Sequence, residues 1–146
     1  MRDEKKIYRV IDANLNRARE GLRVVEDFAR FVLDDAALSS DIKIARHNLD
    51  KISRVAYPRL VSSRDSGGDV FRKTRESAKK DMNSVVVSNI KRAEESLRTL
   101  EEFSKMISAS AGSGFKKIRF RIYDIEKNIA EKTARQRRRS PKGNKK

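Results

Sequence analysis

Apolar residues recur along the first third of the chain at alternating steps of three and four. One such seam runs over residues 8–32 and a second over residues 42–56. This spacing is that of one face of an α-helix. The two runs therefore predict a helical hairpin over about residues 4–57. The second helix is expected to end near Tyr57 and Pro58, because a residue before proline avoids helical angles.

The same spacing returns in the second half of the chain. Apolar positions over residues 86–107 and 115–129 predict another helical hairpin, over about residues 83–132. We expect Ser39–Asp41 to cap the second helix and Asn83–Ser84 to cap the third. The segment Ala111–Gly114 is expected to end the third helix, since glycine commonly terminates helices.

Each hairpin presents an apolar stripe that only the other hairpin can cover. The prediction is an all-α fold, a four-helix bundle made of two repeated helical hairpins, with one domain over residues 1–132. The period-two alternation of β-strands is absent. Residues 58–82 form a long loop between the second and third helices, and loops of this length are usually functional or disordered. Residues 133–146 are expected to form a disordered basic tail.

The two hairpins also repeat polar residues. At an offset of 75 positions, residues 11–32 and 86–107 share eight identical residues. The identical pairs are Asn14/Asn89, Arg17/Arg92, Ala18/Ala93, Glu20/Glu95, Leu22/Leu97, Arg23/Arg98, Glu26/Glu101 and Phe28/Phe103. A core requires repeated apolar residues but not repeated Asn, Arg and Glu. Two similar polar half-sites are therefore the best indication of function.

Helical phase separates the inward polar residues from the outward ones. At 100° per residue, Asn14 lies within the apolar sector of its helix and Arg17 lies at its edge. Asn89 and Arg92 repeat this arrangement in the second hairpin. A ligand between the first and third helices would meet two amides and two guanidiniums. The alternative for the Asn pair is a buried polar layer that fixes the helix register.

The same phase places three further residues. Arg46 lies at the edge of the inward face of the second helix and has a counterpart in Arg119, so it is a candidate for phosphate binding. Arg23 falls on the outward face, where a surface ion pair with Asp27 is the expected role. The single histidine, His47, is expected to be exposed and incidental.

The long loop contains the most unusual segment, Arg64–Val70. Its two glycines let backbone N–H groups approach a phosphate, and Asp65 and Asp69 offer carboxylates for Mg²⁺. Arg64 adds a positive charge. The alternative is an ordinary turn, because Asp and Gly are common turn residues. The segment is not a P-loop, since no Lys-Ser or Lys-Thr follows at the required spacing.

Composition narrows the classes of function. The chain has 146 residues, no cysteine and a net charge of +15, and residues 132–146 contribute eight Lys or Arg without an acid. Disulfides and zinc–cysteine sites are excluded. No apolar run has the roughly 20 residues of a membrane span, so we expect a cytoplasmic protein without membrane contact. The tail is either a solubilising end or a weak contact for nucleic acid.

Three motifs resemble, in order, those of one enzyme family. They are the run at residues 12–27, the Arg-Asp…Gly-Asp loop at 64–69, and the run at 89–103. Together they are similar to the monofunctional hydroxymethylpyrimidine phosphate kinases of thiamine biosynthesis, a helical domain also fused to the N-terminus of some thiamine-phosphate synthases. The resemblance covers about residues 7–107. The chain departs from it at Phe71, where the family usually has glycine.

The resemblance implies an ATP-dependent phosphotransferase. Its substrate is hydroxymethylpyrimidine phosphate, its product the pyrophosphate, and its cofactors are ATP and Mg²⁺. A phosphate nucleophile is already ionised, so no strong general base is required and no catalytic residue is assigned. Arg17, Arg46, Arg64 and Arg92 are expected to neutralise phosphate charge, Asp65 and Asp69 to hold Mg²⁺, and Asn14 or Asn89 to read the aminopyrimidine edge.

Two other functions stay open from the sequence alone. The runner-up is a nucleic-acid-binding helical bundle, which the +15 charge and the arginine-rich tail favour. The chain has no base-reading motif. The third is a purely structural bundle or adaptor without a pocket.

Overall fold

The computed structural model describes residues 2–140 and is built from helices. In chain order these are α1 (Arg2–Phe31), α2 (Ala36–Ser53), the 3₁₀-helix η1 (Arg54–Ala56), α3 (Tyr57–Ser63), α4 (Met82–Ser104) and α5 (Ala109–Arg139). No strand occurs within residues 2–140. The prediction of an all-α bundle is confirmed.

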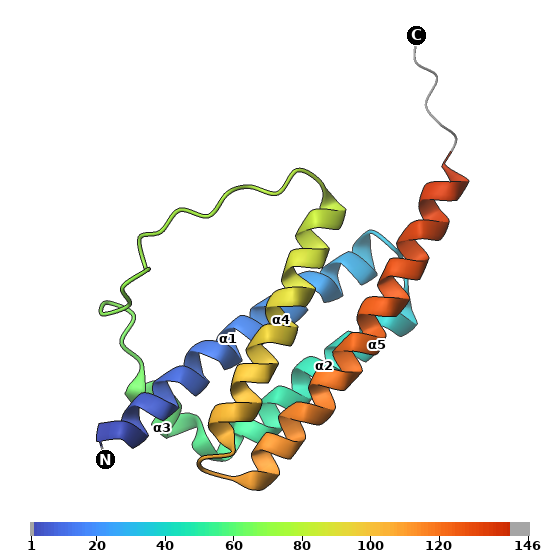
Figure 1. The fold of residues 1–146 in the computed structure, drawn as a ribbon. Coiled ribbons are helices and arrows are strands. Elements are labelled where there is room, and N and C mark those ends of the chain that lie inside the picture. The colour runs from blue at the N-terminus through green and yellow to red at the C-terminus, as the bar shows by residue number, and fades with distance from the viewer. Residues whose placement is uncertain (1, 141–146) are drawn as a thin grey trace.

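The four long helices form a closed ring in which α1 packs on α2 and α4, and α5 packs on the same two helices. Neighbouring helices run antiparallel, and residues 64–81 arc along one side of the bundle from the end of α3 to the start of α4 (Figure 1). The core contains fully buried side chains from every long helix, among them Leu22, Leu49, Leu97 and Ile122. Each hairpin thus covers the apolar stripe of the other.

The helices α1 and α4 approach each other closely at Gly21. A Cβ atom built there would lie 2.9 Å from the backbone oxygen of Asn89. Only glycine permits this approach without a shift of α4. The equivalent position in the second repeat is Ser96, which is buried.

Both predicted helix caps were wrong by a few residues. Asp35 caps α2 by accepting a hydrogen bond from the backbone N–H of Leu38 at 2.9 Å, so α2 begins before Ser39. Asp81 caps α4 by accepting from the N–H of Ser84 at 2.7 Å. This hydrogen bond to the backbone is the main cause that lowers the pKa of Asp81. Aspartate is as good a cap as serine, and composition alone did not choose between them.

The predicted helix stop at Ala111–Gly114 was also wrong. The chain turns between Ser104 and Ala109, and both Gly112 and Gly114 lie inside α5. A Cβ atom at Gly114 would lie 2.8 Å from Cδ1 of Ile52, and one at Gly112 would lie 2.7 Å from Cγ of Lys105. These glycines therefore allow the start of α5 to pack against its neighbours.

Helical structure continues past Pro58, where the second helix was expected to end. The chain changes direction at η1, and Pro58 then occupies the first turn of α3. Proline is tolerated there because the first turn leaves its N–H groups unpaired in any case. Part of the predicted loop 58–82 is therefore the short helix α3, which packs on α1.

The basic end of the chain is helical as far as Arg139. Residues 133–139, expected to be disordered, continue α5, which projects beyond the rest of the bundle (Figure 1). Most residues there are good helix formers, and the basic last turn favours a helix C-terminus. Lys132 also forms an ion pair with Asp35. Residues 141–146 of the predicted tail lie outside the described residues.

Candidate functional site

A polar cavity of about 500 Å³ lies between α1 and the start of the long loop. Five of the eight residues proposed from the sequence line it, and they come from two segments that are about 50 positions apart. Those residues are Asn14, Arg17, Arg64, Asp65 and Asp69. We call this cavity, with its lining from α1 and residues 64–72, the basic pocket.

A double hydrogen bond fixes the loop to α1. The Nε and Nη2 atoms of Arg64 donate to the two carboxylate oxygens of Asp12, both at 2.8 Å. This hydrogen bonding to Asp12 raises the pKa of Arg64. Arg9 donates to the backbone oxygen of Asp65 at 3.1 Å, one residue further along. Planar two-point contacts define orientation, so this part of the loop is held in place over α1.

The two loop aspartates shape their own turns. Oδ1 of Asp65 accepts from the N–H of Gly68 at 2.9 Å, and Oδ1 of Asp69 accepts from the N–H of Phe71 at 3.0 Å. The turn interpretation is therefore correct for one oxygen of each carboxylate. The other oxygen of each has no hydrogen-bond partner among the described residues. The turn role and the proposed Mg²⁺ role of these two residues are therefore compatible.

The side-chain N–H₂ groups of the two predicted asparagines, Asn14 and Asn89, are already bonded within the protein. Nδ2 of Asn14 donates to the backbone oxygen of Val10 at 2.9 Å, and Nδ2 of Asn89 does the same to Val85 at 2.8 Å. Asn14 is 6% exposed, which agrees with its predicted inward phase. The Oδ1 atom of Asn14 lies 3.5 Å from Nη1 of Arg17. The repeated asparagines thus share a local hydrogen-bond geometry.

The basic pocket holds more positive charge than its carboxylates neutralise. It is lined by four arginines and three aspartates, and Asp12 is paired with Arg64. Within residues 2–140, no carboxylate lies at ion-pair distance from the other three arginines, which are Arg9, Arg17 and Arg72. An uncompensated group of guanidiniums beside a cavity is suited to an anionic ligand.

Sequence reasoning missed five polar residues of this pocket. They are Arg9, Asp12, Asn16, Ser66 and Arg72. Helical phase would have grouped the first three, because they lie within about 60° of one another around α1. Arg72 is exposed in the loop, and no periodic pattern points to it.

The structure does not bring the second half-site to this pocket. Arg92 is on α4, where its Nη2 atom lies 3.2 Å from Oε1 of Glu76 in the long loop. Asn89 is half-buried beneath the α1–α4 crossing at Gly21. The two repeats therefore do not form one continuous set of amides and guanidiniums.

Arg46 is engaged elsewhere, in an ion pair inside the first hairpin. Its Nε atom donates to Oε2 of buried Glu26 at 2.9 Å. The second hairpin repeats this contact, since Nη2 of Arg119 donates to Oε2 of Glu101 at 2.8 Å. Burial raises the pKa of Glu101, but its hydrogen bonds from Arg119 outweigh that effect and hold the pKa below its usual value. The repeated Arg–Glu pairs join the two helices of each hairpin.

A pair of carboxyl groups lies between α4 and α5. Glu94 is 7% exposed, and burial together with hydrogen bonding to Glu126 raises its pKa to about 7. Burial also acts on Glu126, but hydrogen bonds from Glu94 and Lys91 keep its pKa below the usual value. Nζ of Lys91 lies 3.0 Å from Glu126. Near neutral pH, Glu94 is therefore partly protonated.

The remaining predictions concern surface residues. Nε of Arg23 lies 3.6 Å from Asp27, which confirms the expected surface pair. His47 is exposed, as predicted. Within residues 2–140, no helix combines the length and the apolar character needed to cross a membrane.

Comparison with known proteins gives consistent matches. The model of the ThiD2 family matches residues 9–128. The chain is 38% identical over 126 residues to a thiamine-phosphate synthase of Nostoc punctiforme, covering 84% of this chain and 35% of that protein. It is 34% identical over 144 residues to a thiamine-phosphate synthase of Rhodopirellula baltica, covering 93% of this chain and 38% of that protein.

Both of these relatives are much longer than the region that matches. The chain spans little more than a third of the length of each. Their names therefore describe proteins that contain considerably more sequence. No solved structure matches the chain significantly.

Proposed function

Because the chain belongs to the ThiD2 family, we propose that it acts in thiamine biosynthesis as an ATP-dependent kinase of hydroxymethylpyrimidine phosphate. In the proposed reaction, a phosphate oxygen of the substrate attacks the γ-phosphorus of ATP. The bond from that phosphorus to the β–γ bridging oxygen breaks, and ADP leaves with the electron pair. The names of the relatives support the pathway, and the proposed product would be handed to a thiamine-phosphate synthase.

The observation that carries this proposal is the group of unpaired guanidiniums in the basic pocket. The reaction brings together the phosphates of two anions, and catalysis of phosphoryl transfer consists mainly of alignment and charge neutralisation. Arg9, Arg17 and Arg72 are available for that purpose, whereas Arg64 is committed to Asp12. We therefore assign phosphate binding to the first three and loop positioning to Arg64.

The proposed Mg²⁺ site fits the residues that are present. Mg²⁺ is usually held by one or two carboxylates together with substrate phosphates and water. Asp65 and Asp69 each keep one carboxylate oxygen outside their turn. No group of three or more His, Cys, Asp or Glu suited to a metal occurs in residues 2–140, so phosphate oxygens would have to complete the shell. When bound, the ion would neutralise charge on those phosphates.

The amide that reads the pyrimidine ring is better assigned to Asn16 than to Asn89. Asn16 is half-buried, lines the basic pocket, and its side chain has no hydrogen-bond partner among the described residues. A free carboxamide offers one acceptor and two donors to an aminopyrimidine edge. Asn14 retains only its oxygen for such a contact, because its N–H₂ group is bonded to Val10.

The direct test is a coupled assay of ATP consumption with hydroxymethylpyrimidine phosphate and Mg²⁺. Asp65→Asn and Asp69→Asn should lower turnover and raise the Mg²⁺ concentration needed for half-maximal rate. Asp124→Asn is the matched control, because Asp124 is exposed on α5 and away from the loop. No ATP consumption by the folded wild-type chain would refute the kinase. Unchanged Mg²⁺ dependence in both variants would refute the metal assignment alone.

A nucleic-acid contact is the second candidate, and one observation favours it. The projecting end of α5 carries exposed Arg135, Arg137, Arg138 and Arg139. Removal of residues 133–146 should abolish binding of a labelled RNA duplex and its dependence on salt, while kinase turnover is retained. RNA affinity that survives the truncation would exclude this surface.

A further inference from the structure

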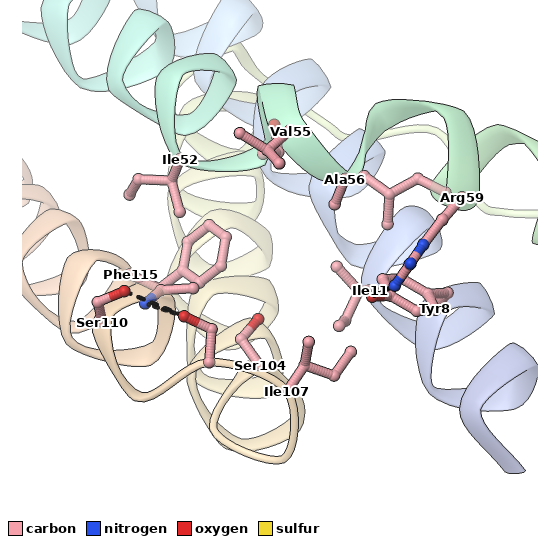
Figure 2. Close-up of a pocket in the computed structure, with 14 residues that line it drawn as sticks. Tyr8, Ile11, Ile52, Val55, Ala56, Arg59, Ser104, Ile107, Ser110 and Phe115 are labelled. Atoms are coloured by element: carbon pink, nitrogen blue, oxygen red, sulfur yellow. Dashed lines mark hydrogen bonds between the residues drawn. The ribbon is translucent and has the colours of Figure 1, made fainter.

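A second cavity lies on a different side of α1 from the basic pocket. It has a volume of about 630 Å³ and is enclosed by the start of α1, the α2–η1–α3 segment, and the turn from α4 to α5. Figure 2 shows side chains from all of these elements arranged around an open centre. The size is within the range of small-molecule sites in proteins. Nothing in the proposed reaction uses this cavity.

The wall of the cavity is mainly apolar. Ile11 and Phe115 form buried parts of it, and Ile52 lies on the same side as Phe115, across from Ile11 (Figure 2). At the mouth, Val55 is 94% exposed and Ile107 is partly exposed. An apolar recess with apolar residues at its opening favours a ligand with an aromatic or aliphatic body.

One hydroxyl at the cavity, on a residue that is otherwise buried, is free to bond a ligand. Ser104, near the end of α4, is 4% exposed and lines the cavity, and its oxygen points toward the open centre in Figure 2. Within residues 2–140, its Oγ atom forms no hydrogen bond. A hydroxyl that faces a cavity and makes no bond within the protein can donate to, or accept from, a molecule bound there. The hydroxyl is therefore available to a polar atom of a bound molecule.

A second polar position lies at the rim. Nη1 of Arg59 donates to the phenol oxygen of Tyr8 at 3.1 Å and lies 3.6 Å from Glu4. Because the Tyr8 oxygen accepts this bond, its own proton can be donated to a ligand. The hydrogen bond to Tyr8 also raises the pKa of Arg59, which keeps its positive charge at this edge. An acidic group on a ligand would meet both residues.

We propose that this cavity is a second ligand site, for a compact aromatic or heteroaromatic molecule that carries a hydrogen-bond acceptor and one acidic group. The aromatic body lies against Phe115 and Ile11, the acceptor meets Ser104, and the acid meets Arg59. The site is separate from the basic pocket, because the two cavities share no lining residue. It does not depend on the proposed kinase activity.

A fluorescent probe of this class tests the proposal. Anilinonaphthalene sulfonate combines aromatic rings, an amine and a sulfonate, and its emission rises in apolar surroundings. Titration of the folded full-length chain should show saturable binding of one probe molecule. Ser104→Ala should weaken the affinity for the probe by about fivefold, because one hydrogen bond to the probe would be lost. Ser113→Ala, on the exposed side of α5, is the matched control and should leave it unchanged.

Two further variants locate the probe. Ala111→Leu partly fills the cavity and should abolish saturable binding, with circular dichroism as the check on folding. Arg59→Gln should lower the affinity for the sulfonate probe by more than it lowers the affinity for N-phenylnaphthylamine, which is uncharged. If Ala111→Leu does not fold, Ser104→Ala and Arg59→Gln still decide the matter.

Competition separates this cavity from the basic pocket. Inorganic pyrophosphate, which carries charge but no ring, should not displace the probe, and Arg17→Ala should not change the probe affinity. Displacement by pyrophosphate, loss of binding in Arg17→Ala, or equal affinity in Ser104→Ala and wild type would each overturn the proposal. Loss of kinase activity has no bearing on these results.

Discussion

The two hairpins have the same frame but different surfaces. Both contain a buried Arg–Glu pair between their helices, at Arg46–Glu26 and Arg119–Glu101, and both place an asparagine amide on the carbonyl four residues earlier. Only the first hairpin carries the basic pocket. In the second, the equivalent of Arg17 is Arg92, which pairs with Glu76.

The comparison separates two kinds of repeated polar residue. The Arg–Glu pairs and the asparagine amides are used twice because each hairpin has the same packing to maintain. Arg17 and Arg92 are identical in sequence but differ in surroundings, because the loop that completes the pocket starts beside α1 and ends beside α4. Repetition in the sequence therefore indicates shared structure more reliably than shared chemistry.

The largest expected effect comes from a buried Arg–Glu pair. Glu101→Ala leaves Arg119 without its carboxylate, and the free energy of unfolding should fall by about 3 kcal/mol. Urea denaturation measures this change. Glu102→Ala, on the exposed neighbour, is the control and should cost far less. Equal losses at both positions would show that the pair does not hold the hairpin together.

The second effect concerns the two equivalent arginines. Arg17→Ala should lower kcat/KM for the proposed reaction by about 100-fold, since an uncompensated phosphate contact would be lost. Arg92→Ala should lower it by less than about tenfold, because Arg92 pairs with Glu76 outside the pocket. Calorimetric titration with pyrophosphate gives the same comparison without turnover. Equal losses would mean that both repeats bind phosphate.

The third effect tests a position where the repeats differ in charge. Glu94 in the second repeat stands where the first has Arg19, which lies 3.1 Å from Asp50. The folded state raises the pKa of Glu94 to about 7, so it binds more protons than the unfolded state between about pH 4.5 and 7. The contribution of Glu94 to the free energy of unfolding is therefore fully present below about pH 4.5 and is lost as the pH rises through about 7.

Glu94→Gln should remove this dependence. The variant should be more stable than wild type at pH 8, by about 1 kcal/mol after allowance for partial solvent screening, and the difference should shrink toward pH 4.5. Thermal unfolding at a series of pH values measures it. Glu95→Gln, on the exposed adjacent position, is the control. A constant difference at all pH values would contradict the raised pKa of Glu94.

The smallest effect is expected at the exposed ion pairs that both repeats contain. Arg23 and Arg98 each face an acid four residues later, Asp27 and Glu102, at 3.6 and 3.2 Å. Replacement of either arginine by alanine should change the unfolding free energy by no more than about 0.5 kcal/mol. Denaturation midpoints should shift equally in the two variants. A clear inequality would show that one of these pairs is coupled to its buried neighbour.

Periodicity predicted the helices and the burial of Asn14, because both depend on positions within one helix. It did not predict the role of Gly112 and Gly114, since a glycine that ends a helix and one that admits a neighbour look alike until the neighbour is known. Phase alone assigned Arg46 to a ligand, although Glu26 neutralises it. The parallel repetition of Glu26/Glu101 and Arg46/Arg119 was the signal that would have revealed this pair. Arg72 lies in a loop without periodicity, so only the fold places it in the pocket.

The connection between the hairpins lies outside the core. Residues 64–81 are anchored near their start by Arg64 and touch α4 through Glu76, but they contribute no buried apolar side chain. The contacts between hairpins are the same whether both belong to one chain or to two. Such a linkage would permit domain swapping, in which two chains exchange hairpins and form a dimer that reuses the contacts between the hairpins. Concentration during refolding would then select between monomer and exchanged dimer, with the basic pocket preserved where α1 and its loop stay in one chain.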